Sequence, residues 1–331
     1  MSVPARPVNR VKLEQFMTLH AAFYNNSGRL RSGWRFAMFL LMFIFASLVL
    51  SVVMQGISAA LNAEFAGGSG VFLLVSSILS LAAALAVGWL AGRFFEGLPF
   101  RALGASFTSG WAQNLVLGLL IGGATITLAV AIAFIGGNFR LKMNSAPAAA
   151  IADTAVRSLV IFAAAAAFEE ALFRGYILQT FSRAGLAWFA IAMTSAFFGV
   201  VHLGNPNAGI ISTANTVLAG VWFGVAYLKT RDLWFPFALH FVWNWMQGSV
   251  FGIEVSGLTE IVREPLFREA DAGPVWLTGG DYGIEGGIAC TIAIAASIAA
   301  IHFIPWTKAD AELLAMSGPE FDRVNTRESV S

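Results

Sequence analysis

The sequence predicts an all-α membrane protein, a polytopic transmembrane helical bundle of about eight spans with both termini cytoplasmic. Three observations predict this class. Of the 331 residues, 57% are hydrophobic and only 12% are charged, about half the charged share of a soluble domain. Apolar runs of about 20 residues, the length that crosses a bilayer core, recur along the chain. The basic residues are distributed unequally among the segments that join these runs.

Eight apolar runs are candidate spans, and they cover residues 36–60, 71–91, 112–135, 155–180, 186–203, 209–228, 233–253 and 286–305. The first run is longer than the apolar region of a signal peptide, and no clear small-residue cleavage site follows it, so we expect a retained anchor. The segment 254–285 is acidic and rich in Gly and Pro. We expect it outside, with a short surface helix near 261–270.

The basic residues indicate the orientation. If the N-terminus is cytoplasmic, the outer loops hold only Arg140, Lys142, Arg263 and Arg268, and the fourth run contains Arg157 and Arg174. The inner segments hold all the others, which are Arg6, Arg10, Lys12, Arg29, Arg31, Arg35, Arg93, Arg101, Arg183, Lys229, Arg231, Lys308, Arg323 and Arg327. Cytoplasmic loops carry an excess of Lys and Arg. Both termini are therefore expected inside, with an even number of spans.

Three regions follow from this layout. Residues 1–35 form a cytoplasmic N-terminal segment, in which apolar and basic residues at 13–23 are typical of an interfacial helix or of an ordinary packing helix. Residues 36–305 form the bundle, with a motif-bearing core at 155–253, and residues 306–331 form a polar cytoplasmic tail. The 20 basic and 19 acidic residues leave no basic surface for nucleic acid. Membrane lipids are the expected surroundings.

Small residues and the single cysteine add constraints on packing. Gly118 and Gly122 form one GxxxG pair within a span, and Gly220 and Gly224 form another. Such pairs let helix backbones approach closely, so we assign them to packing. Cys290 is the only cysteine, which excludes an intrachain disulfide.

The fourth span contains a cluster of charged residues at membrane depth, in the sequence FEEALFR. Charged groups within spans are costly and are candidates for function. Glu170 and Arg174 are four residues apart, so they share a helix face and can pair. Glu169 is rotated by about 100° from Glu170 and has no cation within its own helix, which suits a general base. The alternative is a purely structural Glu–Arg pair with Glu169 as a packing partner.

Two further spans carry polar residues at helical spacing. Phe198 and His202 are four apart late in the fifth span, and His240 and Asn244 are four apart in the seventh. An imidazole and a carboxamide on one face can both donate hydrogen bonds to a developing oxyanion. They can equally form a hydrogen-bonded contact between helices. The other histidines, His20 and His302, have no polar neighbours of this kind and are interpreted as interfacial residues.

Together these residues resemble the three ordered motifs of the CAAX protease and bacteriocin-processing (CPBP) family of intramembrane endopeptidases. The motifs lie between residues 169 and 244. The resemblance implies that Glu169, assisted by His202, activates water, and that His240 and Asn244 stabilise the oxyanion. It also implies that Glu170 and Arg174 support the site, that Phe198 lines the pocket, and that the substrate is a protein or peptide. The implied location is integral and multi-pass, which in a prokaryotic cell is the inner or plasma membrane.

The resemblance leaves the cofactor open. Glu169, His202 and His240 could supply three ligands to Zn²⁺ and leave a fourth position for water. A metal-free glutamate mechanism is equally compatible with the sequence. No HExxH motif is present, which excludes a zincin-type site on one helix.

One geometric difficulty accompanies this hypothesis. Counted from the predicted cytoplasmic ends at 1.5 Å per residue, Glu169 lies about 20 Å deep, His202 about 24 Å and His240 only about 10 Å. The three groups can share one water only if the seventh span begins deeper. An extended entry through residues 233–236, before Pro236, would supply the missing depth.

Three other functions fit parts of the sequence. A proton- or ion-coupled transporter would also bury ionisable groups, although no internal repeat is visible. A non-catalytic membrane scaffold or immunity protein could retain the same residues. A rhomboid-type serine protease is suggested only by the GGSG sequence at 67–70, which a Gly/Ser turn explains more simply.

Overall fold

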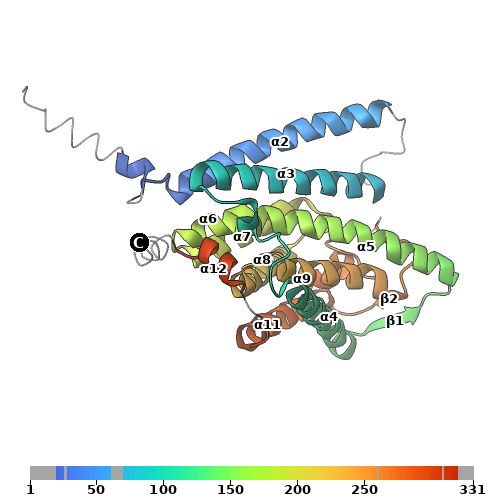
Figure 1. The fold of residues 1–331 in the computed structure, drawn as a ribbon. Coiled ribbons are helices and arrows are strands. Elements are labelled where there is room, and N and C mark those ends of the chain that lie inside the picture. The colour runs from blue at the N-terminus through green and yellow to red at the C-terminus, as the bar shows by residue number, and fades with distance from the viewer. Residues whose placement is uncertain (1–19, 26–27, 61–69, 259–260, 308, 320–331) are drawn as a thin grey trace, which may run out of the picture.

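The computed structural model describes residues 20–25, 28–60, 70–258, 261–307 and 309–319, and it is a bundle of long helices (Figure 1). The predicted interfacial helix at 13–23 lies largely outside the described residues, as does most of the GGSG sequence. The principal helices are α2 (Ser32–Ala60), α3 (Gly70–Glu96), α4 (Trp111–Gly136), α5 (Ala148–Glu170), α6 (Leu178–Arg183), α7 (Ala187–Val201), α8 (Ile210–Thr230), α9 (Trp234–Trp245) and α11 (Ile288–Phe303).

The polytopic helical class is confirmed. Among the described residues, six helices are long and apolar enough to cross a membrane, and the fourth of them runs without a break from α5 through α6. The seventh predicted run forms α9 and a π-helical segment, η4 (Met246–Val250), and the eighth forms the 16-residue α11. The count of eight spans and the cytoplasmic side of the termini stay predictions.

Burial distinguishes the helices that face lipid from those that form the core. In the most apolar window of α2, 6% of the residues are buried inside the protein, against 50% for α8. Figure 1 shows α2 and α3 side by side along one side of the bundle. Since α2 exposes Leu41, Phe45 and Val52, contact with lipid is the environment that accounts for this surface.

The expected surface helix near 261–270 is wrong. That segment instead supplies β2 (Phe267–Asp271), which pairs antiparallel with β1 (Phe139–Met143). Pro265 precedes the strand and cannot donate the backbone hydrogen bond that a helix there would need. This two-stranded sheet lies at the end of the bundle opposite to α12 (Ala311–Ser317) and the C-terminal end of α6 (Figure 1).

A buried ion cluster joins three helices at the end where α12 lies. Glu96 at the end of α3 accepts from Arg35 of α2 at 3.0 Å and from Arg183 of α6 at 2.6 and 2.7 Å. All three side chains are buried. Two of the cations counted for the orientation are thus fixed to a carboxylate rather than exposed in a loop, and breaking such a pair costs about 3–5 kcal/mol.

The glycine pairs bring the motif helices into backbone contact, as predicted. A Cβ added at Gly118 would lie 2.6 Å from the Cβ of Ala238, and one at Gly122 would lie 2.8 Å from the carbonyl oxygen of Leu239. These contacts hold α4 against α9. A Cβ added at Gly220 would likewise lie 2.7 Å from the Cα of Ser195. This close approach holds α8 against α7.

We predict that Gly122→Ile destabilises the protein. The new side chain would overlap the backbone of α9, and overpacking of this kind costs about 1–3 kcal/mol or more. The thermal unfolding midpoint of the detergent-solubilised protein measures the loss. The control is Gly56→Ile in α2, where a Cβ meets nothing within 4 Å. Equal midpoints for the two variants would show that α4 and α9 are not in close contact.

Candidate functional site

A carboxylate and two cationic or cation-forming groups meet at the centre of the bundle. Glu170, at the end of α5, accepts from Arg174 Nη1 at 3.0 Å, and its Oε1 lies 3.0 Å from Nδ1 of His240 on α9. Glu170 and Arg174 are completely buried and His240 nearly so. The predicted Glu170–Arg174 pair is present. Because a carboxylate only accepts hydrogen bonds, His240 donates through Nδ1.

Glu169 lies on the other side of the same imidazole. Its Oε2 is 3.7 Å from Nε2 of His240, so the ring lies between the two adjacent carboxylates. This oxygen is buried and, within the described part of the chain, has no hydrogen-bond partner. The Glu169 side chain nevertheless remains 24% exposed. One oxygen of Glu169 is therefore buried without a hydrogen bond, while the exposed part of the side chain borders a space that water or substrate can enter.

His202 is oriented by its own helix. It follows α7 directly, and its Nδ1 lies 2.7 Å from the carbonyl oxygen of Phe198. The carbonyl can only accept, so the proton is on Nδ1, and in the neutral ring Nε2 carries a free lone pair. The rings of His202 and Phe198 lie 4.5 Å apart between centroids. The four-residue spacing seen in the sequence thus produces a fixed tautomer.

Aromatic rings hold the buried guanidinium and the second imidazole. Arg174 lies over the rings of Phe198 and Phe223, with its Cζ 5.3 and 5.2 Å from their centroids. Phe223 also stacks on His240 at 4.6 Å. Cation–π contact favours the charged guanidinium in this apolar setting. Arg174 also donates to the carbonyl of Gly220 at 3.0 Å, which links the cluster to α8.

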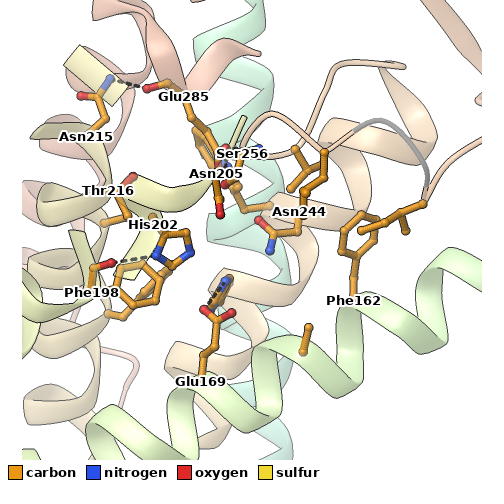
Figure 2. A pocket seen from close by; sticks show the side chains of 18 of the residues that line it. Phe162, Glu169, Phe198, His202, Asn205, Asn215, Thr216, Asn244, Ser256 and Glu285 are labelled. Carbon is orange, nitrogen blue, oxygen red and sulfur yellow. Dashed lines mark hydrogen bonds and ion pairs between the residues drawn. The ribbon is translucent and has the colours of Figure 1, made fainter. Parts of the chain in front are cut away.

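The predicted site residues border one cavity of about 270 Å³. Glu169, Phe198, His202, His240 and Asn244 line it, whereas Glu170 and Arg174 lie behind it. Figure 2 shows Asn244 with its amide turned into the space between Ser256 and Glu169, and His202 above Glu169. The three spans therefore contribute to a common pocket, as the sequence predicted.

Both glutamates and Asn244 lie directly before π-helical segments. The segment η2 (Ala171–Ile177) follows Glu170 and contains Arg174, and η4 follows α9 and begins two residues beyond Asn244. π-helical turns are rare and are frequent at functional sites. Apolar periodicity does not reveal them, because one wider turn leaves the pattern of the flanking helix almost unchanged.

The depth difficulty is resolved by the position at which α9 begins. Leu233, the residue before α9, lies beside Gly175: a Cβ added at Gly175 would be 4.0 Å from Cδ1 of Leu233. Gly175 itself lies about 12 Å before the end of α6. From this level Glu169 is six residues away along its helix and His240 is seven residues away along α9, so the two side chains meet. The expected extended entry is wrong, since α9 is helical from Trp234.

A polar contact accounts for the deep start of α9. Asp232 is buried, and its Oδ1 accepts from the backbone N–H groups of Trp234 and Phe235 at 3.1 and 3.2 Å. Its Oδ2 accepts from Asn114 of α4 at 2.6 Å. The first turn of α9 is thereby capped inside the protein. Asp232 was not identified as a capping residue from the sequence.

The histidines have part of the arrangement of metal ligands. Each uses Nδ1 for a hydrogen bond and leaves Nε2 toward the cavity or Glu169, as histidine ligands commonly do. However, no group of three His, Cys, Asp or Glu side chains within the described ranges is placed to hold a metal ion. The three-ligand Zn²⁺ site does not fit these side-chain positions, and Zn²⁺ stays a prediction of the resemblance.

Comparison with known proteins supports the resemblance. Residues 151–246 match the model of a family described as type II CAAX prenyl endopeptidase Rce1-like. The matched segment contains all three motifs. A search among curated proteins finds no match. The resemblance that the motifs indicate is thereby confirmed: residues 151–246 of this multi-pass membrane protein are similar to the Rce1-like endopeptidases of the CPBP family.

Proposed function

We propose that the protein is an intramembrane endopeptidase that hydrolyses peptide bonds of membrane-associated proteins or peptides through a water activated by Glu169. The observation that carries the proposal is the His240 ring between two glutamates at the inner end of a cavity. An ion pair that served packing alone would not leave the Glu169 side chain partly exposed in the wall of that cavity. The match to the Rce1-like family supports the same reaction class.

Glu169 acts as the general base in this proposal. Its partly exposed carboxylate takes a proton from water while the water oxygen attacks the peptide carbonyl carbon. The carbonyl oxygen then carries the negative charge. When the tetrahedral intermediate collapses, Glu169 returns the proton to the leaving amine. General acid–base catalysis of this kind contributes about 10²–10⁴ in rate.

His240 and Asn244 stabilise the oxyanion. With Nδ1 bonded to Glu170, His240 can donate from Nε2 only as an imidazolium. Glu169, Glu170 and Arg174 together carry one net negative charge, which an imidazolium at His240 would balance. Asn244 lies one helical turn beyond His240 and supplies a second donor from the same face.

His202 orients the attacking water. Its Nδ1 is committed to the Phe198 carbonyl, so Nε2 is an acceptor, and a water that donates to this nitrogen can donate its other proton to Glu169. Phe198 holds both the ring of His202 and the guanidinium of Arg174, and therefore acts as a packing residue.

We predict that Glu169→Gln abolishes cleavage of an internally quenched peptide library by the protein in liposomes, because the amide cannot accept the proton. His202→Ala and His240→Ala should have the same effect without loss of membrane insertion. Glu312→Gln, in an exposed ion pair on α12, is the matched control and should retain wild-type rates. Undiminished cleavage by Glu169→Gln would contradict the mechanism, whereas the absence of cleavage by the wild type would favour a scaffold or transport role.

Asn244→Ala should lower the rate by a smaller factor. Removing one oxyanion donor costs on the order of 10²–10³ in kcat, and His240 remains. Steady-state kinetics on the same library should show the change in kcat with little change in KM. A variant whose loss is confined to KM would show that Asn244 binds substrate in its ground state instead.

The pocket is proposed to open away from the cytoplasm. The loop residues Asn205, Ser256 and Glu285 line it, and these loops lie at the end of the bundle opposite to α12. The excess of basic residues in the segments at the α12 end indicates that this end is cytoplasmic. Substrate would then reach Glu169 from the outer side of the membrane.

Cysteine labelling tests this orientation. With Cys290 replaced by alanine, we expect Asn205→Cys to react with a membrane-impermeant maleimide added outside right-side-out vesicles, and Glu312→Cys to react only after lysis. The reverse pattern would place the pocket on the cytoplasmic side.

A further inference from the structure

The outer end of the cavity carries a second carboxylate. Figure 2 shows Glu285 at the end of the pocket away from Glu169, with Ser256, Asn205 and His202 between them. No lysine or arginine is among the described residues that line this cavity. Glu169 and Glu285 are the carboxylates in its wall, so the pocket presents negative charge at both ends.

Glu285 is held as an oriented anion. Its Oε2 accepts from the backbone N–H and the hydroxyl of Ser256 at 2.7 and 2.8 Å, and its Oε1 accepts from the indole N–H of Trp243 at 3.2 Å. These three donors fix the orientation of the carboxylate. A carboxylate oxygen has two acceptor positions, so Oε1 can accept one more hydrogen bond from a ligand in the cavity.

The turn that faces Glu285 is itself constrained. Ser256 has a φ of 52° and Gly257 a φ of 78°, and a left-handed serine costs energy unless its surroundings hold it. The two hydrogen bonds to Glu285 hold it. Burial and the nearby Glu285 carboxylate raise the pKa of Tyr282, beside this turn, above its usual value.

We infer that Glu285 is a specificity-determining residue, which binds an ammonium or guanidinium group of the peptide while Glu169 acts on the scissile bond. This inference rests on the proposed function and adds a substrate class to it. A terminal carboxylate at this end would meet the carboxylate of Glu285 and no lysine or arginine, and such like-charge contact is strongly unfavourable. A lysine or arginine side chain, or a free N-terminal amine, is complementary.

The test uses the full-length protein in liposomes and internally quenched peptide libraries. Each library fixes one position as Lys, Gln or Glu and randomises the others. For at least one position, we expect the wild type to cleave the Lys library about tenfold more efficiently than the Gln library, equivalent to 1.4 kcal/mol. The Glu library should be the poorest. The preference should appear as a lower KM for the Lys library, and it should become smaller as the ionic strength rises.

Two variants separate recognition from structure. Glu285→Gln should reduce the Lys-to-Gln ratio to near one while cleavage of the Gln library continues, and Glu285→Asp should retain a preference for Lys. An equal loss on all libraries would show a structural role and overturn the inference.

The wild type alone also tests the inference, so it does not depend on the folding of a variant. If Glu169-dependent cleavage shows no charge preference at any position, the inference is wrong and the proposed function stands. If no library is cleaved in a Glu169-dependent way, the proposed function fails, and the inference fails with it.

Discussion

The hydrogen bond between Glu170 and His240 is the contact on which the rest of the site depends. It joins α5 to α9 across the centre of the bundle at 3.0 Å, in a region from which water is largely excluded. Arg174 neutralises the carboxylate from within its own helix, and Phe198 and Phe223 enclose the guanidinium. Because leaving any member of such a buried cluster unpaired costs several kcal/mol, the cluster fixes the imidazole orientation on which the proposed chemistry relies.

The surrounding helices are arranged so that this contact can form. Gly118 and Gly122 let α9 approach α4 at backbone distance, and Asp232 caps α9 at a depth that brings His240 level with Glu169. Beyond the site, Glu285 accepts a hydrogen bond from Trp243, which is also on α9. One short helix therefore connects the inner carboxylates to the outer wall of the cavity, which relates the proposed catalysis to the proposed recognition of a cation.

The membrane class, the helices and the grouping of Glu169, His202, His240 and Asn244 could be predicted because apolar runs and polar residues within them are explicit in the sequence. The start of α9 could not be predicted, because it depends on a hydrogen bond between Asp232 and Asn114, which are 118 residues apart. The pairing of 267–271 with β1 also depends on a distant partner. Glu285 and Phe223 were missed because a glutamate in an acidic loop and a phenylalanine in an apolar span carry no local signal of contact with a site.

Nitrogen-15 NMR of the histidine side chains tests the central contact most directly, with resonances assigned from His240→Gln and His202→Gln in lipid bilayers. A protonated, hydrogen-bonded Nδ1 on His240 is predicted, with a resonance that shifts strongly in Glu170→Gln. His202 is predicted to show a protonated Nδ1 that the Glu170 substitution does not change. An unprotonated Nδ1 on His240, or a His240 spectrum insensitive to Glu170, would contradict the account.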